Sequence, residues 1–302
     1  MLSGAFDLTG RIALVTGGGQ GLGFTIARGL GQAGAILALN DINKEVLDRA
    51  LAQLAGEGLR VHGYIFDVTK AEQIEAQVAR IEEEVGPIHI LLNNAGIQRR
   101  VPLDTCEESI WREILDVNVT GIFLVTRAVV RGMIERRAGK IINMCSLMSE
   151  VGRPTTGPYT ASKGAVKMLT KAMCVEWAKH NIQVNGIGPG YFLSGMGQNL
   201  AKDPAFNAWI CSRTPAARWG EPVELVGAAV FLASPASDFV NGQVIYVDGG
   251  MLAALAVSDV YPESEIVSAR ETAVTLGLDL VEVETSELVD PHFRANDPDR
   301  CY

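Results

Sequence analysis

The feature that most constrains the fold is an apolar run that ends in glycines and continues as a helix. Residues 11–16 read RIALVT, the segment GGGQGLG follows, and apolar residues then recur at helical spacing through Ile26 and Leu30. Glycine is required where a backbone turns with positive φ or closely approaches a pyrophosphate. The free N–H groups at the start of the next helix attract phosphates. The junction therefore predicts a strand, a phosphate-binding turn and a helix. The residues of this turn that we expect to contact a dinucleotide are Gly17, Gln20, Gly21, Leu22 and Gly23.

A second strand, at 35–40, ends at Asp41, eighteen positions after Gly23. A carboxylate at this place accepts hydrogen bonds from the ribose hydroxyls of an adenosine and repels a 2′-phosphate. Neither Ile42 nor Asn43, which follow, is basic. The charges therefore predict NAD or NADP as cofactor with NAD favoured, held in part by Asp41 and Ile42. An alternative is that Asp41 only caps the helix that starts near Lys44.

Strand and helix patterns alternate along the first half of the chain. Helices are predicted at 44–56, 70–85 and 107–137, and strands at 61–66, 87–92 and 140–145. This order is typical of an α/β fold, a single-domain Rossmann-type doubly wound parallel sheet with helices on both faces. Such sheets bind ligands at the carboxyl ends of their strands. Cofactor contacts are therefore expected from Asp67, Val68, Asn94, Ala95 and Gly96, although Asp67 has the alternative role of capping the next helix.

Tyr159 and Lys163 stand four residues apart where a new helical pattern begins. Residues at this spacing share a helix face, and an ammonium beside a phenol stabilises the phenolate, which can act as a base near neutral pH. Ser146 follows the apolar run 141–145 and places a hydroxyl at the end of a strand. Asn118 interrupts an apolar helix face, where its amide needs hydrogen-bond partners. The Tyr–Lys pair alone is a weak indication, because such pairs also occur by chance on helix surfaces.

Together these motifs resemble the short-chain dehydrogenase/reductase family over roughly residues 7–252. The motifs are TGGGQGLG, NNAG, Asn118, Ser146, YTASK from Tyr159 to Lys163, Pro189-Gly190 and VDGG. The resemblance implies a dehydrogenase in which Tyr159 is the acid/base on the substrate oxygen. Lys163 would make Tyr159 more acidic and hold the nicotinamide ribose. Ser146 would orient the substrate, and Asn118 would anchor a water that relays protons.

The resemblance also implies that the loop after a strand at 182–187 lies against the nicotinamide, through Pro189, Gly190 and Phe192. Leu193-Ser194 departs from the family pattern, in which a threonine-containing pair is usual. A further helix is predicted at 221–233 and a last strand at 243–247. The family implies a homotetramer or homodimer.

Several stretches, among them NNAGIQRRVPL, MCSLMSEVGRP and FVNGQVIYVDGG, are similar to gluconate 5-dehydrogenases within this family. This similarity implies NAD(P)-dependent oxidation of a secondary alcohol of a sugar acid, of the gluconate to 5-ketogluconate type, or of a polyol. Arginine forks match carboxylates, and Arg99 and Arg100 follow the NNAG loop. The alternative is that these two are solvated loop charges. The expected substrate contacts are Arg99, Arg100, Ser146, Glu150, Arg153 and Tyr159.

Two other functions remain open. A 3-oxoacyl thioester reductase would use Arg99 and Arg100 to meet a phosphopantetheine arm or an acidic carrier protein. A catalytically silent dinucleotide sensor is an alternative of another class, against which the intact Asn118, Ser146, Tyr159 and Lys163 argue.

The composition excludes several classes. The chain has 302 residues, a net charge of −9 and a pI of about 5.1, which argues against nucleic acid as a partner. Its five cysteines are scattered without metal-ligand spacing, so no metal site is expected and the thiols are expected to be reduced. We see neither a signal-peptide pattern nor an apolar run of the ~18 residues that span a bilayer. The expected localisation is cytoplasmic, without a membrane partner.

The tail at 253–302 differs from the rest of the chain. It holds eleven acids against three arginines, a charge of −8 out of −9. We expect residues 1–252 to form the dehydrogenase domain, with 194–220 as a substrate lid. The acidic C-terminal extension 253–302 would be mobile or wrap a neighbouring subunit, with a helix at 262–276 and a short strand at 280–283.

Overall fold

The computed structural model describes residues 4–252, 255–258, 267, 270–272, 274 and 282–285. The chain divides into two compact units. The first comprises Met1–Asn199 and Gly220–Val247, and the second comprises Leu200–Trp219 and Asp248–Tyr302. All of the predicted site residues lie in the first unit.

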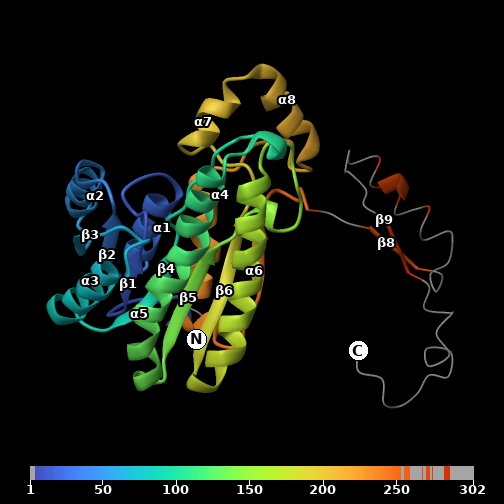
Figure 1. The fold of residues 1–302 in the computed structure, drawn as a ribbon. Coiled ribbons are helices and arrows are strands. Elements are labelled where there is room, and N and C mark those ends of the chain that lie inside the picture. The colour runs from blue at the N-terminus through green and yellow to red at the C-terminus, as the bar shows by residue number, and fades with distance from the viewer. Residues whose placement is uncertain are drawn as a thin grey trace, which may run out of the picture. The chain divides into compact units, whose positions relative to one another are not determined.

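The first unit is built on a seven-stranded parallel sheet in the order β3-β2-β1-β4-β5-β6-β7 (Figure 1). The strands are β1 (Ile12–Val15), β2 (Ile36–Asp41), β3 (Val61–Ile65), β4 (Ile88–Asn93), β5 (Gly139–Met144), β6 (Ile182–Pro189) and β7 (Val244–Val247). Because β1 pairs with both β2 and β4, the strand order reverses there. Doubly wound sheets bind ligands at such a switch point, outside the carboxyl ends of the strands. The predicted fold class is confirmed.

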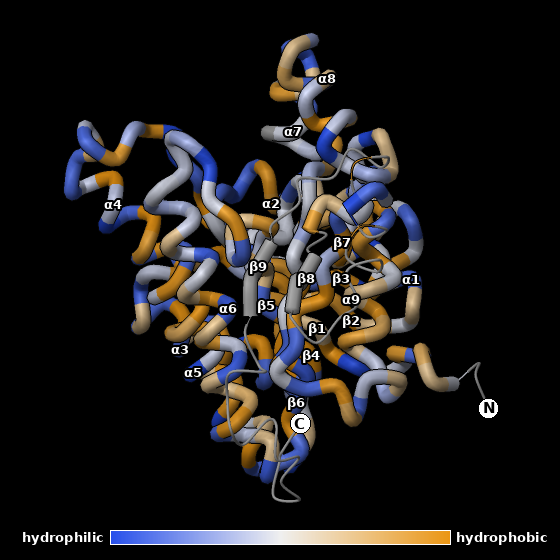
Figure 2. The backbone as a smooth tube through the Cα atoms, turned by 90° about the vertical axis from the view of Figure 1, so that its right-hand side faces the viewer, coloured by the Kyte–Doolittle hydropathy of each residue, from blue (hydrophilic) through white to orange (hydrophobic). Residues whose placement is uncertain are grey.

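Helices cover both faces of the sheet, as predicted (Figure 1). One face carries α1 (Gly21–Gln32), α2 (Lys44–Gly56) and α9 (Val226–Ala233), and the other carries α3 (Ala71–Glu84), α5 (Gly121–Arg136) and α6 (Gly157–Trp177). Successive strand residues point to opposite faces, so Val15 joins the first apolar cluster and Leu14 joins the second. The strands consequently form much of the apolar interior (Figure 2).

The helix predicted at 107–137 consists of α4 (Glu108–Leu115), a π-helical turn at Asp116–Thr120, and α5. Such turns are frequent at functional sites, and this one contains Asn118. Within the described part of the chain, the run Glu108–Arg136 is the one helix long and apolar enough to cross a membrane by length and composition. A core helix of a globular protein can be equally long and apolar. Val125 and Val129 of this run are buried in the apolar cluster between the sheet and α3, α5 and α6.

Buried amides tie β4 and β5 to the helices behind them. The Asn93 amide donates to Thr126 Oγ1 (2.8 Å) and to Asn143 Oδ1 (2.9 Å). The Asn143 amide in turn donates to Thr170 Oγ1 (2.9 Å). Since unpaired polar groups are costly to bury, these bonds fix the two strands relative to α5 and α6. They therefore set where the carboxyl ends of β4 and β5 lie.

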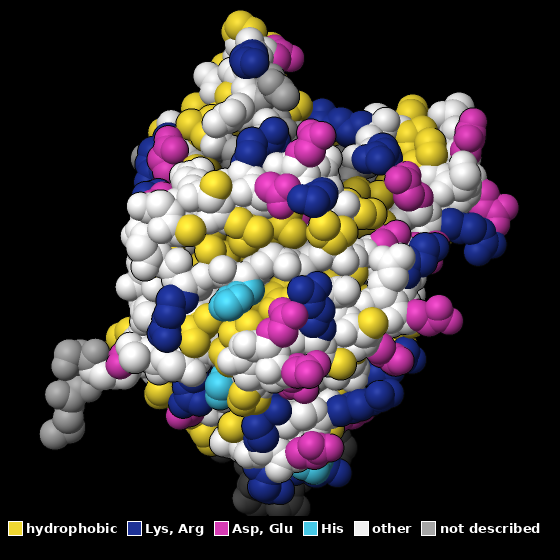
Figure 3. Space-filling view, turned by 90° about the vertical axis from the view of Figure 1, so that its left-hand side faces the viewer, with side chains coloured by type: hydrophobic (Ala, Val, Ile, Leu, Met, Phe, Trp, Pro, Cys, Tyr) yellow, Lys and Arg dark blue, Asp and Glu magenta, His cyan; other side chains and the backbone are white. Residues whose placement is uncertain are grey.

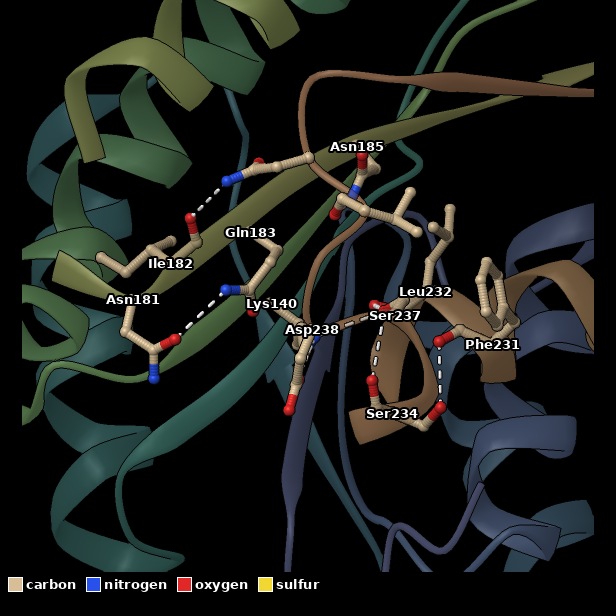
Figure 4. A network of polar contacts seen from close by, with 12 residues as sticks. Lys140, Asn181, Ile182, Gln183, Asn185, Phe231, Leu232, Ser234, Ser237 and Asp238 are labelled. Carbon is tan, nitrogen blue, oxygen red and sulfur yellow. Dashed lines mark hydrogen bonds and ion pairs between the residues drawn. The ribbon is translucent and has the colours of Figure 1, made fainter. Parts of the chain in front are cut away.

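A second polar network lies at the opposite, amino-terminal end of β5 and β6 (Figure 4). Lys140 Nζ donates to Asp238 Oδ1 (2.7 Å), and the Ser237 hydroxyl bonds the carbonyl of Leu232 (3.1 Å). The Asn241 amide donates to the carbonyl of Ile182 (3.1 Å). Burial lowers the pKa of Lys140 despite the hydrogen bond to Asp238. The network attaches the segment after α9 to the sheet, away from the predicted site.

Charges of both signs are interspersed on the face of the first unit that carries α2, α3 and β3 (Figure 3). Two of its ion pairs are Lys44–Asp48 (2.6 Å) and Arg80–Glu84 (2.7 Å), each within one helix. Mixed charge of this kind differs from the basic stripe of a nucleic-acid-binding surface.

The second unit contains α8 (Pro204–Arg213) and two short strands, β8 (Leu255–Ser258) and β9 (Glu282–Thr285), which pair in parallel. The Phe206 ring stacks on Trp209, with centroids 5.7 Å apart. The preceding helix, α7 (Met196–Ala201), spans the boundary between the units. The strand expected at 280–283 is thus found at 282–285, paired with a strand that we did not predict. Most of the helix predicted at 262–276 lies outside the described residues, and the lid role of 194–220 stays a prediction.

Candidate active site

The glycine turn between β1 and α1 is packed against the loop after β4. A Cβ on Gly23 would lie 2.3 Å from Asn94 Nδ2 and 2.4 Å from the Gly17 carbonyl, so no larger residue fits there. Gly17 and Gly21 have φ near +60°, a conformation that glycine adopts without strain. Around a Cβ on Gly21 there would be no atom within 4 Å. The turn is therefore tightly packed against the protein at Gly23, whereas there is open space next to Gly21.

Two side chains brace this turn. The Asn94 amide donates to the carbonyls of Thr16 (3.0 Å) and Gly17 (2.9 Å). The Thr16 hydroxyl accepts from the backbone N–H groups of Asn94 (3.0 Å) and Ala95 (3.1 Å). The role of Thr16 was not predicted from the sequence. Its position could have indicated it, because Thr16 is a hydroxyl residue directly between a strand and the glycines. Asn94 and Ala95 thus contact the glycine turn between β1 and α1.

The start of α1 fits a bound phosphate. Gln20 is its N-cap residue, but no side chain caps the helix, and its first turn has no acidic residue. The first N–H groups of a helix otherwise need such partners, and together with the positive end of the helix dipole they form an anion site. Leu22, in the same turn, packs against the apolar cluster below.

Asp41 ends β2 with its side chain turned toward the glycine turn, and it is 8% exposed. Its Oδ2 accepts from the Gly19 N–H (3.2 Å), and its Oδ1 accepts from the Asn43 N–H (3.0 Å). Helix α2 is capped by Asn43, whose side chain accepts from the Val46 N–H (3.1 Å). The alternative that Asp41 merely caps α2 is therefore wrong. Ile42 is 67% exposed, which leaves an apolar side chain open beside Asp41.

Asp67 and Val68 follow β3. Asp67 Oδ1 accepts from the backbone N–H and the hydroxyl of Thr69, both at 2.8 Å. It closes this turn and does not cap α3, whose N-cap residue is Lys70. Val68 is buried, and a Cβ on Gly121 would lie 3.0 Å from its side chain.

Asn118 is buried in the π turn and joins this turn to the loop after β4 and to α6. Its Oδ1 accepts from the Ile97 N–H (2.8 Å), and its Nδ2 donates to the Ile97 carbonyl (2.9 Å) and to Ser162 Oγ (3.0 Å). Both amide protons are thus used within the protein. Gly96 lies beside it, because a Cβ there would be 3.2 Å from Asn118 Oδ1. The sequence reasoning missed Ser162, which lies next to Lys163.

Tyr159 and Lys163 lie on one face of α6, as the spacing predicted. The Lys163 Nζ is 5.6 Å from the centre of the Tyr159 ring. Lys163 is only 4% exposed, and its Nζ donates to the carbonyl of Met144 (2.6 Å), the last residue of β5. Tyr159 is half-buried. The structure therefore holds an ammonium at the carboxyl end of a central strand, next to a phenol.

Ser146 lies just beyond β5, in the turn that leads toward α6. Its Oγ accepts from the Met148 N–H (3.1 Å), and its backbone N–H donates to Ser149 Oγ (3.3 Å). Its neighbour Cys145 is buried, and burial raises the pKa of that thiol to about 11 although the Lys163 charge opposes the shift. The thiol is therefore protonated at neutral pH.

The four charged residues predicted to contact the substrate lie in different surroundings from one another. Arg99 pairs with Glu113 (3.1 Å) and is half-exposed, and Arg100 is exposed on the same loop. Arg153 bonds the Tyr191 hydroxyl and lies 5.6 Å from that ring centre. Glu150 accepts from Lys167 and Tyr246, so its carboxylate is already paired within the protein.

The loop after β6 is attached to its surroundings by backbone bonds. Gly190 N–H donates to the Val247 carbonyl (2.9 Å), and Gly220 N–H donates to the Tyr191 carbonyl (2.9 Å). Phe192 is buried, and its ring lies 2.6 Å from where a Cβ on Gly220 would be. Its side chain thus packs inward, and Pro189 and Gly190 lie at the strand end. No group of His, Cys, Asp and Glu able to hold a metal occurs among the described residues.

This arrangement of a glycine turn, strand-end loops and a Tyr–Lys helix is that of a dehydrogenase. The sequence profile described as short chain dehydrogenase matches residues 11–205, and the chain belongs to this family.

Similar proteins narrow the comparison. The chain is 56% identical over 250 residues to a 5-keto-D-gluconate 5-reductase of Escherichia coli K12, covering 83% of this chain and 98% of the relative. It is 52% identical over 252 residues to a 2-dehydro-3-deoxy-D-gluconate 5-dehydrogenase of Formosa agariphila, covering 83% and 96%. A crystal structure of a gluconate 5-dehydrogenase from Burkholderia cenocepacia J2315 in complex with NADP and tartrate is 51% identical, with a TM-score of 0.82. That match covers 84% of this chain and all of the other.

Proposed function

We propose that the chain is an NAD(P)-dependent oxidoreductase that interconverts a secondary alcohol and a ketone in a sugar acid, gluconate and 5-ketogluconate being the expected pair. The observation that carries the proposal is the buried Lys163 ammonium, 5.6 Å from the Tyr159 ring at the carboxyl end of the central strands. Relatives at 51–56% identity that are named for gluconate and 5-keto-D-gluconate support the substrate class.

The residues present fit a nicotinamide dinucleotide. The uncapped start of α1 and the open space at Gly21 suit its pyrophosphate, and Asp41 and the exposed Ile42 suit its adenosine end. The remaining expected contacts come from the strand-end residues Asp67, Val68, Asn94, Ala95, Gly96, Pro189, Gly190 and Phe192. A dinucleotide held there would supply the hydride acceptor for oxidation of the carbinol carbon and the hydride donor for reduction of the ketone.

The proton is moved by Tyr159. In oxidation its phenolate oxygen takes the proton of the substrate hydroxyl, and in reduction the phenol returns that proton to the ketone oxygen. Lys163 stabilises the phenolate because its charge is held nearby and out of water. Its Nζ has three protons, one of which bonds Met144, so two remain for the ribose hydroxyls and the site.

Ser146 and Asn118 support this step in different ways. Ser146 Oγ already accepts from the Met148 N–H, so its proton is available to donate to the substrate oxygen. Asn118 fixes Ile97 and Ser162 with its side chain, which holds the loop after β4 close to α6. We propose that a water at the helix opening made by its π turn relays the proton from Lys163 to solvent.

Three arginines, Arg99, Arg100 and Arg153, are candidates to bind the carboxylate of the substrate. Arg99 and Arg100 lie on the exposed loop after the NNAG segment, and Arg153 lies beside Tyr191. A guanidinium binds a planar carboxylate with two parallel hydrogen bonds. We propose that at least one of these arginines binds the acid end of the sugar. Glu150, also expected to contact the substrate, carries a negative charge and accepts from Lys167 and Tyr246, so it is not among the residues proposed to bind this carboxylate.

For the cofactor we propose a preference for NAD. Asp41 is an acid at the ribose end of the site, and no basic residue follows it directly. The NADP in the Burkholderia cenocepacia structure shows that a similar protein accepts a 2′-phosphate. The test is the ratio of kcat/KM for NAD and NADP in wild type and in Asp41→Ala. We expect NAD to be preferred and the variant to move the ratio toward NADP. A strong NADP preference in wild type would contradict the charge argument.

The substrate proposal is tested with a panel assayed with both cofactors. It contains gluconate, 5-ketogluconate, 2-dehydro-3-deoxy-gluconate, a polyol and an acetoacetyl thioester. We expect the highest kcat/KM with a sugar acid, and we expect Arg99→Ala or Arg153→Ala to raise KM for the acid but not for the uncharged polyol. Activity confined to the thioester would favour the 3-oxoacyl reductase. We further propose that the chain acts as a homodimer or homotetramer in the cytoplasm. Size-exclusion chromatography with light scattering tests the oligomeric state.

A further inference from the structure

The turn that carries Ser146 is attached to α6 by its next residues. It is a short 3-10 turn, Leu147–Ser149, and Ser146 is its N-cap. Turns of this length have few hydrogen bonds of their own, so the position of the Ser146 hydroxyl depends on what the turn is bonded to. Two neighbours, Ser149 and Glu150, provide these bonds.

Ser149 connects the backbone on both sides of the predicted active site. Its Oγ accepts from the Ser146 N–H (3.3 Å) and donates to the carbonyl of Lys163 (2.9 Å). The Ser149 hydroxyl thus links the backbone of Ser146, which would orient the substrate, to the backbone of Lys163, which lies beside the Tyr159 ring.

Glu150 makes the second attachment one helical turn further along α6. Both carboxylate oxygens accept from Lys167 Nζ at 2.6 Å, and one of them also accepts from the Tyr246 hydroxyl of β7 (2.5 Å). Lys167 is four residues after Lys163, so the two lysines lie on the same side of the helix. The side chains of Glu150 and Lys167 are 33% and 26% exposed, so solvent screens part of their attraction.

The surrounding charges favour an ionised Glu150. Partial burial raises its pKa, but the hydrogen bonds from Lys167 and Tyr246 and the charges of Lys167 and Lys171 outweigh this and lower it overall. The attachment therefore persists through the neutral range. Tyr246 also packs on β6, because a Cβ on Gly188 would lie 2.3 Å from its ring.

We propose that Ser149 and Glu150, with Lys167 and Tyr246 as their anchors, are positioning residues that set the place of the Ser146 hydroxyl relative to Tyr159 and Lys163. This inference rests on the proposed function. It replaces the expected role of Glu150 as a substrate contact with one in which it acts through the Ser146 turn.

The role has a kinetic consequence. A misplaced orienting group lowers the rate of the chemical step, and a shift of about 1 Å costs up to roughly 100-fold. The cofactor site at the glycine turn is formed by other elements, so its affinity is unaffected. The loss falls on kcat, and it is the same for every alcohol, because in this role Glu150 acts through the Ser146 turn and not on a substrate group.

The test compares Glu150→Gln, Lys167→Met, Tyr246→Phe and Ser149→Ala with wild type. Tyr246→Phe removes one hydroxyl and is the mildest change, should Glu150→Gln fail to fold. The control is Glu108→Gln, which breaks an exposed pair with Arg112 (2.7 Å) outside the site. The measurements are kcat and KM for gluconate and for a polyol, titration of reduced cofactor by fluorescence, and thermal unfolding.

We expect kcat to fall roughly tenfold or more in Glu150→Gln, Lys167→Met and Ser149→Ala, and less in Tyr246→Phe, with unchanged cofactor affinity. The double variant Glu150→Gln/Lys167→Met should lose no more than either single variant, and Glu108→Gln should match wild type. The inference is overturned if Glu150→Gln raises KM at constant kcat while Lys167→Met is normal, which is the behaviour of a substrate contact. It is also overturned if folded variants keep wild-type kcat. An inactive wild type with an intact fold would instead contradict the proposed function.

Discussion

The Lys163 ammonium nitrogen lies 5.6 Å from the centre of the Tyr159 ring, and its hydrogen bond to the Met144 carbonyl holds it there. The lysine is almost fully buried, so its charge acts on the phenol through protein and not through water.

Replacing Tyr159 with Phe removes the oxygen that moves the proton and keeps the ring. We expect kcat to fall by about 10²- to 10⁴-fold, the usual contribution of general acid–base catalysis. Cofactor affinity, measured by fluorescence titration, should remain close to wild type. Turnover at the wild-type rate would remove Tyr159 from the mechanism.

Asn118→Ala breaks three hydrogen bonds, two to Ile97 and one to Ser162. It leaves the partly buried backbone groups of Ile97 without these partners, so the free energy of unfolding should fall by about 1–3 kcal/mol. We also expect a lower kcat, because the loop after β4 is no longer held to α6. Urea unfolding and steady-state kinetics measure the two effects. Unchanged stability would contradict the buried network around Asn118.

Gly23→Ala is expected to disrupt the cofactor turn. The added Cβ would lie 2.3 Å from Asn94 Nδ2 and 2.4 Å from the Gly17 carbonyl, and the backbone cannot yield there without moving the turn. Cofactor affinity should drop strongly while the secondary structure seen by circular dichroism is kept. Gly227→Ala in α9 is the matched control, because its Cβ meets no atom within 4 Å. It should bind cofactor normally and gain up to about 1 kcal/mol in stability.

His89 should make stability depend on pH. Its Nδ1 accepts from the Ile12 N–H (3.1 Å), next to an irregularity in the pairing of β1 with β4. Burial, with the charges of Arg11 and Arg136, lowers the pKa of His89 below its ordinary value. The unfolded chain therefore takes up a proton first as the pH falls below about 6.5. The contribution of neutral His89 to the free energy of unfolding is therefore complete above about pH 6.5. It is lost progressively as the pH falls from there through the lower pKa of His89 in the folded state.

His89→Asn keeps an acceptor for the Ile12 N–H, because the Asn Oδ1 takes the place of the imidazole Nδ1, and it does not titrate. Urea unfolding at about pH 7.5 and about pH 5.5 should show a smaller loss of stability for this variant than for wild type. Equal losses in the two proteins would show that His89 does not contribute to the pH dependence.

The local patterns of the sequence predicted most of the fold. Helix α2 begins and ends at the predicted residues. Strand β3 differs from the prediction by one residue at its end, and β4 differs by one residue at each end. These elements carry regular apolar spacing, which reports burial directly. The strand ends could be predicted for the same reason, because parallel strands bring their carboxyl ends to one edge.

What the sequence could not show were contacts made by single side chains over long separations. Glu150 and Tyr246 are 96 positions apart, and no periodicity connects them. The π turn at Asn118 has no sequence signature of its own, since it arises where a helix accommodates one additional residue. The parallel pairing of β8 with β9 was missed because no strand was predicted at Leu255–Ser258.

The central claim is that the Tyr159 site exchanges a proton with a secondary alcohol of a sugar acid. The most direct measurement identifies, by carbon NMR, the ketone formed when the purified protein oxidises gluconate with NAD or NADP. We predict 5-ketogluconate as the product, and consumption of reduced cofactor when 5-ketogluconate is supplied instead. No turnover in either direction, with ready reduction of an acetoacetyl thioester by the same preparation, would contradict the claim.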